Sequence, residues 1–278
     1  MATKTYAQTG RGDRKRTELG LFAQMYFDIE RLRVSQQIRQ SHLKLDKSPF
    51  ANHVIFDEVF GDLKDAQSVI DVYMIPLVKP HPCWTEFNIN VKGCGLHLLG
   101  LIMGLIRDVT PLTNVSKLWW LCGLGVTSEG KAARPVKGEV LNYDARLKMV
   151  LLGRLGAQFL KNNDPFARRL YDDFKVEEVA KALAAGRVTD VMCVSCFGKD
   201  ERCVTCGGTG KTQVEVGSHK RAIRKVVKLW VACLWDVWRR AEGLPVTEHY
   251  AQSHMGHTGN LITPQRWVEY NLSVNGTE

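Results

Sequence analysis

The chain has no apolar run long enough to cross a membrane. A spanning helix needs roughly 20 apolar residues, whereas the longest candidate, 94–106, is shorter and is interrupted by His97 and three glycines. The first residues carry charge with no apolar segment behind them, so we expect no export signal. Internal repeats and low-complexity tracts are also lacking. These absences predict a cytoplasmic protein with no membrane partner.

Acidic residues are fewer than basic ones. Lys and Arg total 38 against 29 Asp and Glu, which gives a formal net charge of +9. That balance favours a polyanionic partner without identifying it. The 278 residues, 45% of them hydrophobic, suffice for one or two domains with real cores. Eight cysteines, four of them in two CxxC pairs, suit a reducing compartment.

The N-terminal part of the chain predicts an arm and two helices. Residues 1–14 are polar and basic, which is typical of a flexible arm that contacts phosphate or of a plain disordered terminus. A helix is expected from 15 to about 45, with apolar residues at heptad spacing: Phe22, Met25, Ile29 and Leu32. A second is expected from 56 to 75, with the apolar residues Val59, Leu63, Ala66, Ile70 and Tyr73. Pro76 should end it, and the two helices predict an antiparallel hairpin over 15–80.

The middle of the chain carries motifs suited to nucleic acid. Gly93 and Gly95 flank Cys94 ahead of an apolar helix expected over 98–106. Glycines there leave backbone N–H groups free at a helix N-terminus, which attracts phosphate. The loop that follows, over 127–142, displays three cations, Lys131, Arg134 and Lys137. Glycines and a proline keep this loop from being helical throughout, so its cations stay available to a polyanion.

A further helix should begin at Asp144, whose side chain is a suitable N-cap. Its apolar residues recur at every fourth position, at Leu147, Leu151, Leu155 and Phe159. Arg146 and Lys148 lie to either side of that stripe. We therefore expect an amphipathic helix that presents cations beside the basic loop.

The order of these motifs resembles that of a known domain. It is similar to the C-terminal domain of the bridge-RNA-guided insertion-sequence recombinases, where a G-x-G hairpin, an apolar helix, a Leu-Trp…Cys-Gly-Leu run, a Gly-Lys loop and an Arg-Leu-Lys helix follow one another. Here the run is 118–124, the loop contains Gly130-Lys131, and Asn142 precedes the last helix. The segment equally resembles the Nop domain of box C/D-type ribonucleoproteins, above all the Nop-containing Tas proteins of the TIGR-Tas RNA-guided systems. The resemblance covers about 62–175 and, more loosely, 218–243.

The resemblance implies a mainly α protein with a Nop-like domain over 81–190. Such a domain holds a small guide RNA and directs it to complementary nucleic acid, here DNA by preference. In Nop proteins a helical hairpin mediates dimerisation, which implies a homodimer; an ordinary two-helix layer over the core is the alternative. We assign the RNA contacts of this domain to Gly93, Gly95, Lys131, Arg134, Lys137, Asn142, Arg146 and Lys148.

Four cysteines predict a metal site. Cys193 and Cys196 form one CxxC pair, and Cys203 and Cys206 form the next, after six intervening residues. Four thiolates so close in sequence fit one tetrahedral ion, and neighbouring glycines permit the turns that aim N–H groups at sulfur. Because four cysteines leave no open coordination position, we predict a structural Zn²⁺ in a module over 191–216. The isolated cysteines should pack in the core: Cys83, Cys94, Cys122 and Cys233.

The last segment, 217–278, should open with a long amphipathic helix from 219 to about 241. One face is apolar, and Trp235 and Trp238 are expected to anchor it in the core. The other face carries a stripe of four cations, Arg221, Arg224, Lys225 and Lys228. Four cations without an interleaved acid repel one another unless a polyanion lies alongside. The stripe therefore predicts a second track for nucleic acid in preference to a solvated face.

An enzymatic alternative depends on Ser128. In the insertion-sequence recombinases a serine in the loop after the Cys-Gly-Leu motif is the nucleophile, and Ser128 occupies that place. Those enzymes also carry a RuvC-like domain with four carboxylates, for which this sequence shows no pattern, and an unactivated serine is a weak nucleophile. We therefore expect an RNA-binding scaffold without a nuclease and without enzymatic activity. A serine-dependent recombinase or its inactive derivative is the second hypothesis, and a zinc-containing phage transcription regulator is the third.

Overall fold

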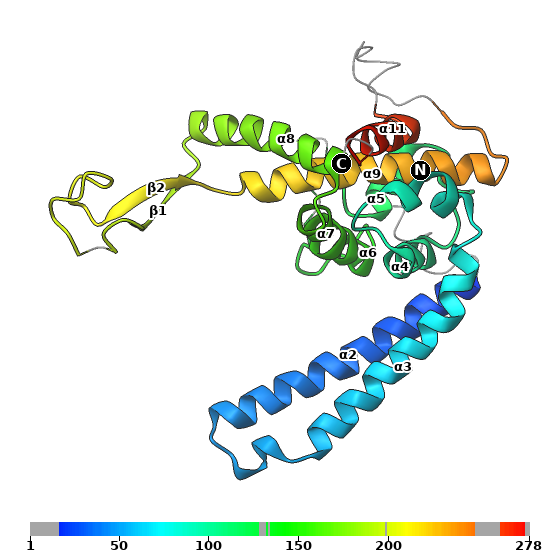
Figure 1. Ribbon diagram of the computed structural model, residues 1–278, viewed down its shortest axis with the longest axis horizontal. Coiled ribbons are helices and arrows are strands. Elements are labelled where there is room, and N and C mark those ends of the chain that lie inside the picture. Colours follow the sequence, from blue (N-terminus) through cyan, green and yellow to red (C-terminus); the bar gives the residue numbers. More distant parts are fainter. Residues whose placement is uncertain (1–16, 128–131, 133, 198, 248–261, 276–278) are drawn as a thin grey trace.

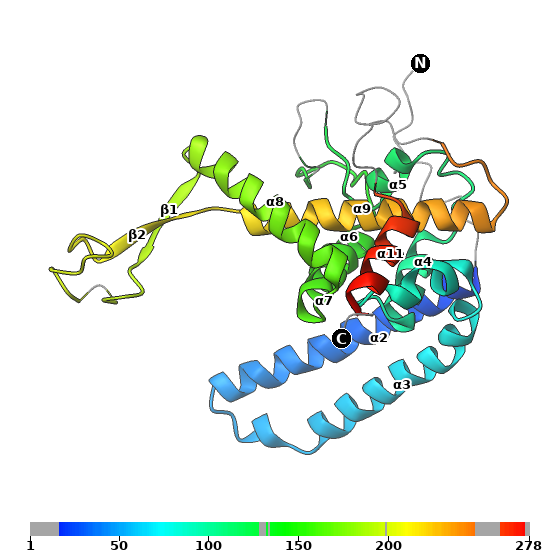
Figure 2. The ribbon, with the colours of Figure 1, turned by 45° about the horizontal axis from the view of Figure 1, so that its top comes forward.

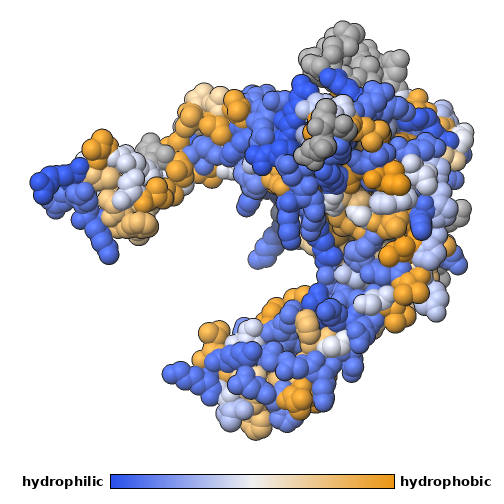
Figure 3. Space-filling view, viewed as in Figure 1, coloured by the Kyte–Doolittle hydropathy of each residue, from blue (hydrophilic) through white to orange (hydrophobic). Residues whose placement is uncertain are grey.

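The computed structural model describes residues 17–127, 132, 134–197, 199–247 and 262–275. The protein is mainly helical, as expected, and the described part contains one small antiparallel sheet. A helical body carries two projections, a helical hairpin and a narrow arm built on the two strands (Figure 1). A wide notch separates these projections in the space-filling view, which gives the molecule the outline of a crescent (Figure 3). None of the described helices has the length and apolar character needed to span a membrane.

The hairpin consists of α2 (Glu18–Leu45), the turn η1 (Pro49–Asn52) and α3 (Ile55–Val78). The heptad expectation is wrong for the inward face of α2. Met25 and Leu32 are 45% and 53% exposed, whereas Ala23 and Phe27 are buried. Because α2 packs against α4 of the body as well as against α3, its buried stripe is not set by a two-helix seam.

Pro76 does not end α3, contrary to the expectation. The helix continues to Val78, and the Lys79 N–H donates to the Ile75 carbonyl at 2.9 Å. A proline removes one N–H donor, but the side chains of Met74 and Val78 on either side of it are fully buried. Their burial stabilises the last helical turn. Met74, and not the exposed Tyr73, therefore continues the inward stripe.

The first helices of the body form an apolar core. α4 (Leu96–Ile106) is buried along almost its whole length, and α5 (Val115–Leu121) packs nearby on α9. One continuous helical stretch follows, made of α6 (Ala145–Met149), η4 (Val150–Leu155) and α7 (Gly156–Lys161). Its start is as expected, because the Asp144 side chain accepts a hydrogen bond from the Leu147 N–H at 3.0 Å.

The apolar residues expected at every fourth position of this stretch are all buried, at 0–1% exposure: Leu147, Leu151, Leu155 and Phe159. In a regular α-helix of 3.6 residues per turn a four-residue repeat drifts around the axis. The wider π-helical turns of η4 compensate for that drift. The four side chains therefore stay on one face.

The long helix α9 (Ser218–Ala241) runs through the body, and α8 (Pro165–Ala184) and α11 (Pro264–Asn275) pack against it (Figure 2). Trp235 and Trp238 lie in the core, as expected. Trp235 donates its indole N–H to the Leu112 carbonyl at 2.7 Å. The buried carboxylate of Asp164 caps α8 and accepts hydrogen bonds from the Trp267 and Asn271 side chains of α11. These contacts fix the helices that surround α9.

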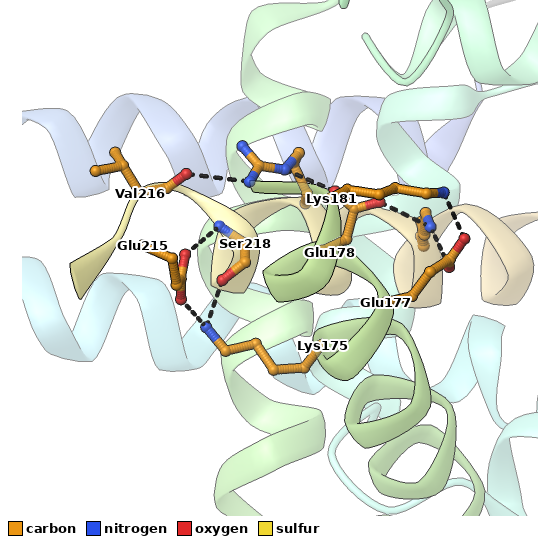
Figure 4. A network of polar contacts seen from close by, with 9 residues as sticks. Lys175, Glu177, Glu178, Lys181, Glu215, Val216 and Ser218 are labelled. Carbon is orange, nitrogen blue, oxygen red and sulfur yellow. Dashed lines mark hydrogen bonds and ion pairs between the residues drawn. The ribbon is translucent and has the colours of Figure 1, made fainter. Parts of the chain in front are cut away.

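The arm is a two-stranded antiparallel ribbon of β1 (Val188–Met192) and β2 (Lys211–Glu215). Val188 pairs with Glu215 and Met192 with Lys211, so the ribbon begins three residues before the expected boundary at 191. At its base the Lys175 ammonium of α8 donates to the Glu215 carboxylate at 2.6 Å and to the Ser218 hydroxyl (Figure 4). The arm is thereby attached to the junction of α8 and α9.

Candidate nucleic-acid interface and metal centre

The cationic stripe of α9 consists of two adjacent rows, and the first is paired with acids. This paired row, Arg221 and Lys225, contacts Glu177 and Glu178 of α8; Figure 4 labels the two glutamates. The Arg221 guanidinium donates to Glu178 at 2.7 Å and to the Val216 carbonyl at 3.0 Å. The Lys225 ammonium lies 2.7 Å from Glu177 and 2.8 Å from Glu178. The stripe has no interleaved acid, but the expectation that its cations need an external polyanion is wrong for this row, because α8 supplies the acids.

The pKa values of the two glutamates reflect that pairing. Hydrogen bonds from Lys181 and Lys225 lower the pKa of Glu177 to about 2. Burial alone would raise the pKa of Glu178, but hydrogen bonds from Lys225 and Arg221 outweigh it and hold the pKa below its usual value. Both carboxylates are thus ionised near neutral pH, and they neutralise the paired row without any external anion.

The second row, Arg224 and Lys228, contacts carbonyls and an aromatic ring. The Arg224 guanidinium donates to the Gly123 and Gly125 carbonyls at 3.2 and 3.0 Å. The Lys228 ammonium lies 4.0 Å from the ring centroid of Trp119, whose indole N–H donates to the Lys228 carbonyl at 3.0 Å. No carboxylate of the described residues pairs with either side chain. This row therefore keeps its net positive charge.

Two more cations join the second row. Lys148 of α6 places its ammonium 4.3 Å from the ring centroid of Tyr143, and its pKa is lowered by burial and by the charges of Arg224 and Arg134. The pKa of Lys228 is lowered by burial and by Arg224. Burial and neighbouring positive charge thus disfavour the protonated forms of both lysines. We call the group of Arg134, Lys148, Arg224 and Lys228 the cationic cluster.

The other residues assigned to nucleic acid from the sequence lie elsewhere. Gly93 adopts a φ of 98° and packs against the Gln158 backbone, where a Cβ would come within 2.7 Å of the carbonyl oxygen. Its glycine is therefore needed for close packing, while Gly95 is exposed at the start of α4. Arg146 lies 3.4 Å from Asp28 of α2. Lys137 is exposed and Asn142 is partly buried.

Three expectations fall on parts of the chain outside the described residues. They concern the basic arm over 1–14, Ser128 and Lys131. Ser128 and Lys131 belong to the loop after α5. An antiparallel bridge joins two described residues on either side of them, Val126 and Ala132. Because Arg224 holds the Gly125 carbonyl, the loop starts and returns next to the cationic cluster.

The four clustered cysteines converge at the end of the arm. Their sulfur atoms all lie within 4.8 Å of one another. The sulfurs of Cys193 and Cys203 are 3.8 Å apart, and those of Cys196 and Cys206 are 3.6 Å apart. A tetrahedral ion with metal–sulfur bonds of about 2.3 Å separates its sulfurs by about 3.8 Å. This geometry can hold one metal ion, with Cys193, Cys196, Cys203 and Cys206 as ligands.

Hydrogen bonds from backbone amides favour the thiolate forms of Cys193 and Cys203, and the thiolate is the form that binds a metal. Hydrogen bonds from the N–H groups of Cys206 and Thr205 lower the pKa of Cys203 to about 7. A hydrogen bond from the Cys196 N–H is the largest cause that lowers the pKa of Cys193. Gly208, with a φ of 80°, permits this turn because a Cβ there would overlap the Glu201 carbonyl. The four isolated cysteines are buried, as expected.

Sequence reasoning missed the residues that decide the character of α9. Glu177 and Glu178 are consecutive acids on α8, and nothing near them in sequence indicates that they face α9. Trp119 belongs to the run 118–124, but its contact with Lys228 depends on how α5 meets α9. The Tyr143–Lys148 contact spans only five residues, whereas the contacts of Glu177, Glu178 and Trp119 with α9 join segments distant in sequence.

Comparison with known proteins identifies no relative. No protein-family model matches the chain, and neither a curated protein nor a solved structure matches it.

Proposed function

We propose that the protein is an RNA-binding scaffold that holds a small guide RNA and presents it to complementary DNA, without a nuclease of its own. The main support for this proposal is the cationic cluster. Arg224 and Lys228 have no carboxylate partner in the described part of the chain, and burial, with a further contribution from neighbouring cations, lowers the pKa values of Lys148 and Lys228. A phosphodiester backbone relieves that repulsion and releases counterions.

Two aromatic rings beside the cationic cluster hold its lysines in place. Trp119 and Tyr143 are partly or largely buried and hold lysine ammonium groups over their faces. Lysines fixed in this way present their charge in a defined geometry. Contacts with phosphate then orient a strand, and its sequence is read elsewhere.

Zn²⁺ is the metal proposed for the four cysteines, in a structural role. The donor set of four thiols, their separations and the amide hydrogen bonds to sulfur all fit that ion. When bound, the ion would hold the end of the arm together, since the ribbon contributes only two short strands. A cytoplasmic location is part of the proposal, because four thiolate ligands and isolated buried cysteines suit a reducing compartment.

A homodimer formed through the hairpin is part of the proposal. The outer faces of α2 and α3 leave large apolar side chains more than half exposed, at Leu32, Ile38, Val69 and Val72. Apolar residues spread along both helices suit a second copy of the same hairpin. Sedimentation of the purified protein measures the oligomeric state directly.

The proposal is tested by purifying the protein from cells that transcribe its own locus and sequencing the RNA that copurifies. A discrete small RNA is expected. Bulk RNA of mixed length that dissociates at modest salt contradicts a guide role and indicates nonspecific binding. A control purification of a variant with Lys148→Gln and Lys228→Gln should recover less of that RNA.

The same preparation separates a scaffold from a serine recombinase. Protein, RNA and labelled target DNA are incubated with Mg²⁺, and a denaturing gel detects any covalent protein–DNA adduct. The scaffold forms none, and Ser128→Ala leaves RNA binding intact. An adduct that disappears in Ser128→Ala would show that the protein is a recombinase, because a nucleophile acts in the chemical step and not in binding.

A further inference from the structure

We propose that a groove at the junction of α2, α4 and α6 binds one unpaired guanine of the RNA, an inference that rests on the proposed function. Two cavities of about 470 and 380 Å³ adjoin there, and Gly20, Gln24 and Arg107 line both. Pockets for small ligands measure about 300–1,000 Å³. Asp144, Ala145 and Arg146 line the second of these cavities. Lys148 of the cationic cluster belongs to the same short helix, α6.

The backbone at the centre of the groove is strained. Arg107 has φ 69° and ψ −53°, and the Asp108 N–H donates to the Ile106 carbonyl at 2.9 Å. This is a γ-turn of the rare positive-φ type, which glycine adopts far more readily than arginine. Strain of this kind is retained mainly at sites that bind a ligand. An arginine here indicates that its side chain is needed.

The guanidinium of Arg107 is available for such a ligand. Arg107 is only partly buried, and its side chain makes no hydrogen bond or ion pair with the described residues. Glu18 lines the same cavity, yet the two side chains form no ion pair. Arg107 and Glu18 thus line one cavity without pairing with each other, so a group that offers both acceptors and donors can contact both.

The mixture of charges favours a base over a phosphate. A carboxylate in the wall repels phosphate, whereas the cationic cluster contains no carboxylate. Guanine presents O6 and N7 side by side, which match the two N–H donors of an arginine fork, and its N1–H and amino group donate to a carboxylate. Adenine places a donor where guanine has O6, so it mismatches Arg107. Leu21 and Leu105 supply apolar wall for the ring.

The experiment measures affinity of the full chain for oligouridine and for the same oligonucleotide with one central guanosine, adenosine or 7-deazaguanosine. We expect the guanosine oligonucleotide to bind on the order of 10-fold more tightly than the adenosine one, as for one bidentate contact. 7-Deazaguanosine, which lacks N7, should lose most of that preference. Arg107→Lys keeps the charge but not the fork, so the preference should disappear while oligouridine affinity stays unchanged.

Arg107→Gly controls for folding. It removes the guanidinium and relieves the strained turn, so the preference should be lost while Tm stays equal or rises. Arg240→Lys, at an exposed arginine that pairs with Asp236, should leave the preference intact. Equal affinities for guanosine and adenosine, with oligouridine still bound, overturn the guanine site and leave the proposed function standing. Failure to bind any RNA overturns both.

Discussion

Arg221 and Lys225 have the same spacing on α9 as Arg224 and Lys228, but the two rows have opposite surroundings. The first row meets the carboxylates Glu177 and Glu178 of α8, while the second meets backbone carbonyls and Trp119. The first is thus neutralised within the protein and stabilises the helix junction at the base of the arm. The second retains charge that an external polyanion can neutralise. A charge pattern on a helix therefore predicts a ligand only when the opposing surface is known.

The strongest change in structure is expected when the metal is removed. This experiment distinguishes the role of the arm from that of the cationic cluster in RNA binding. Chelation should release about one equivalent of Zn²⁺ and unfold the end of the arm, because metal binding supplies about 10–16 kcal/mol in small zinc modules. RNA affinity should change little if the cluster is the binding site. Elemental analysis, hydrogen exchange of 188–215 and RNA titration measure these outcomes.

Cys193→Ser is the matched variant for metal loss, with Cys233→Ser as its control at a buried cysteine outside the site. Metal content should fall in the first and not in the second. Less than about half an equivalent of zinc in the reduced wild-type protein would contradict the structural site. If RNA binding is lost in the variant that loses the metal, the RNA-binding site lies on the arm and not at the cationic cluster.

Charge removal in the two rows tests the comparison directly. Lys148→Gln with Lys228→Gln should weaken RNA binding on the order of 10-fold or more and reduce the slope of log K against log salt by about 1.4, since each single-strand phosphate contact contributes about 0.7. Arg221→Gln with Lys225→Gln should leave that slope unchanged and lower Tm instead. Fluorescence anisotropy over a range of salt concentrations gives both slopes. Equal losses in the two double variants would indicate a diffuse basic surface.

The paired row should contribute to stability through Glu178, whose side chain is 8% exposed. Glu178→Gln leaves Arg221 and Lys225 without their shared partner. Breaking a fully buried ion pair lowers the free energy of unfolding by about 3–5 kcal/mol, and breaking an exposed pair lowers it by less than about 1 kcal/mol. For this partly buried pair we expect a loss of about 2 kcal/mol. Urea unfolding measures it. Asp172→Asn, at the exposed Arg168–Asp172 pair, should cost less than about 0.5 kcal/mol, and an equal loss in both variants would contradict the special role of Glu178.

The smallest expected effect is on acid stability. The folded-state pKa of Glu177 is about 2, below its usual value of 4.5, because Lys181 and Lys225 donate hydrogen bonds to it. Its contribution to stability is therefore complete above pH 4.5 and is lost as the pH falls toward 2. Since the side chain is 45% exposed, salt should screen this contribution. Glu177→Gln should flatten the decline of Tm between these pH values.

At alkaline pH, the loss of the Lys228 proton should change both the stability of the protein and its affinity for RNA. Burial and Arg224 lower the pKa of Lys228, so its protonated form opposes folding below that pKa, and the opposition disappears as the pH rises toward 10.5. RNA binding requires the protonated lysine and should weaken over the same range. An RNA affinity that is constant up to the usual lysine pKa would contradict a contact through Lys228.

The local features of this protein could be predicted from the amino-acid sequence alone. The hairpin, the Asp144 cap, the buried tryptophans of α9 and the four converging cysteines follow from periodicity and spacing, which act over a few residues along the chain. The packing of the helices determines that Glu177 and Glu178 neutralise one row of α9, that Arg134 and Lys148 join the other, and that Gly93 packs on Gln158. It also brings Arg107 and Glu18 into the wall of one cavity, although neither belongs to a motif. The physical reason is that charge pairing and close packing depend on which helices meet, and burial of the whole apolar core fixes that arrangement.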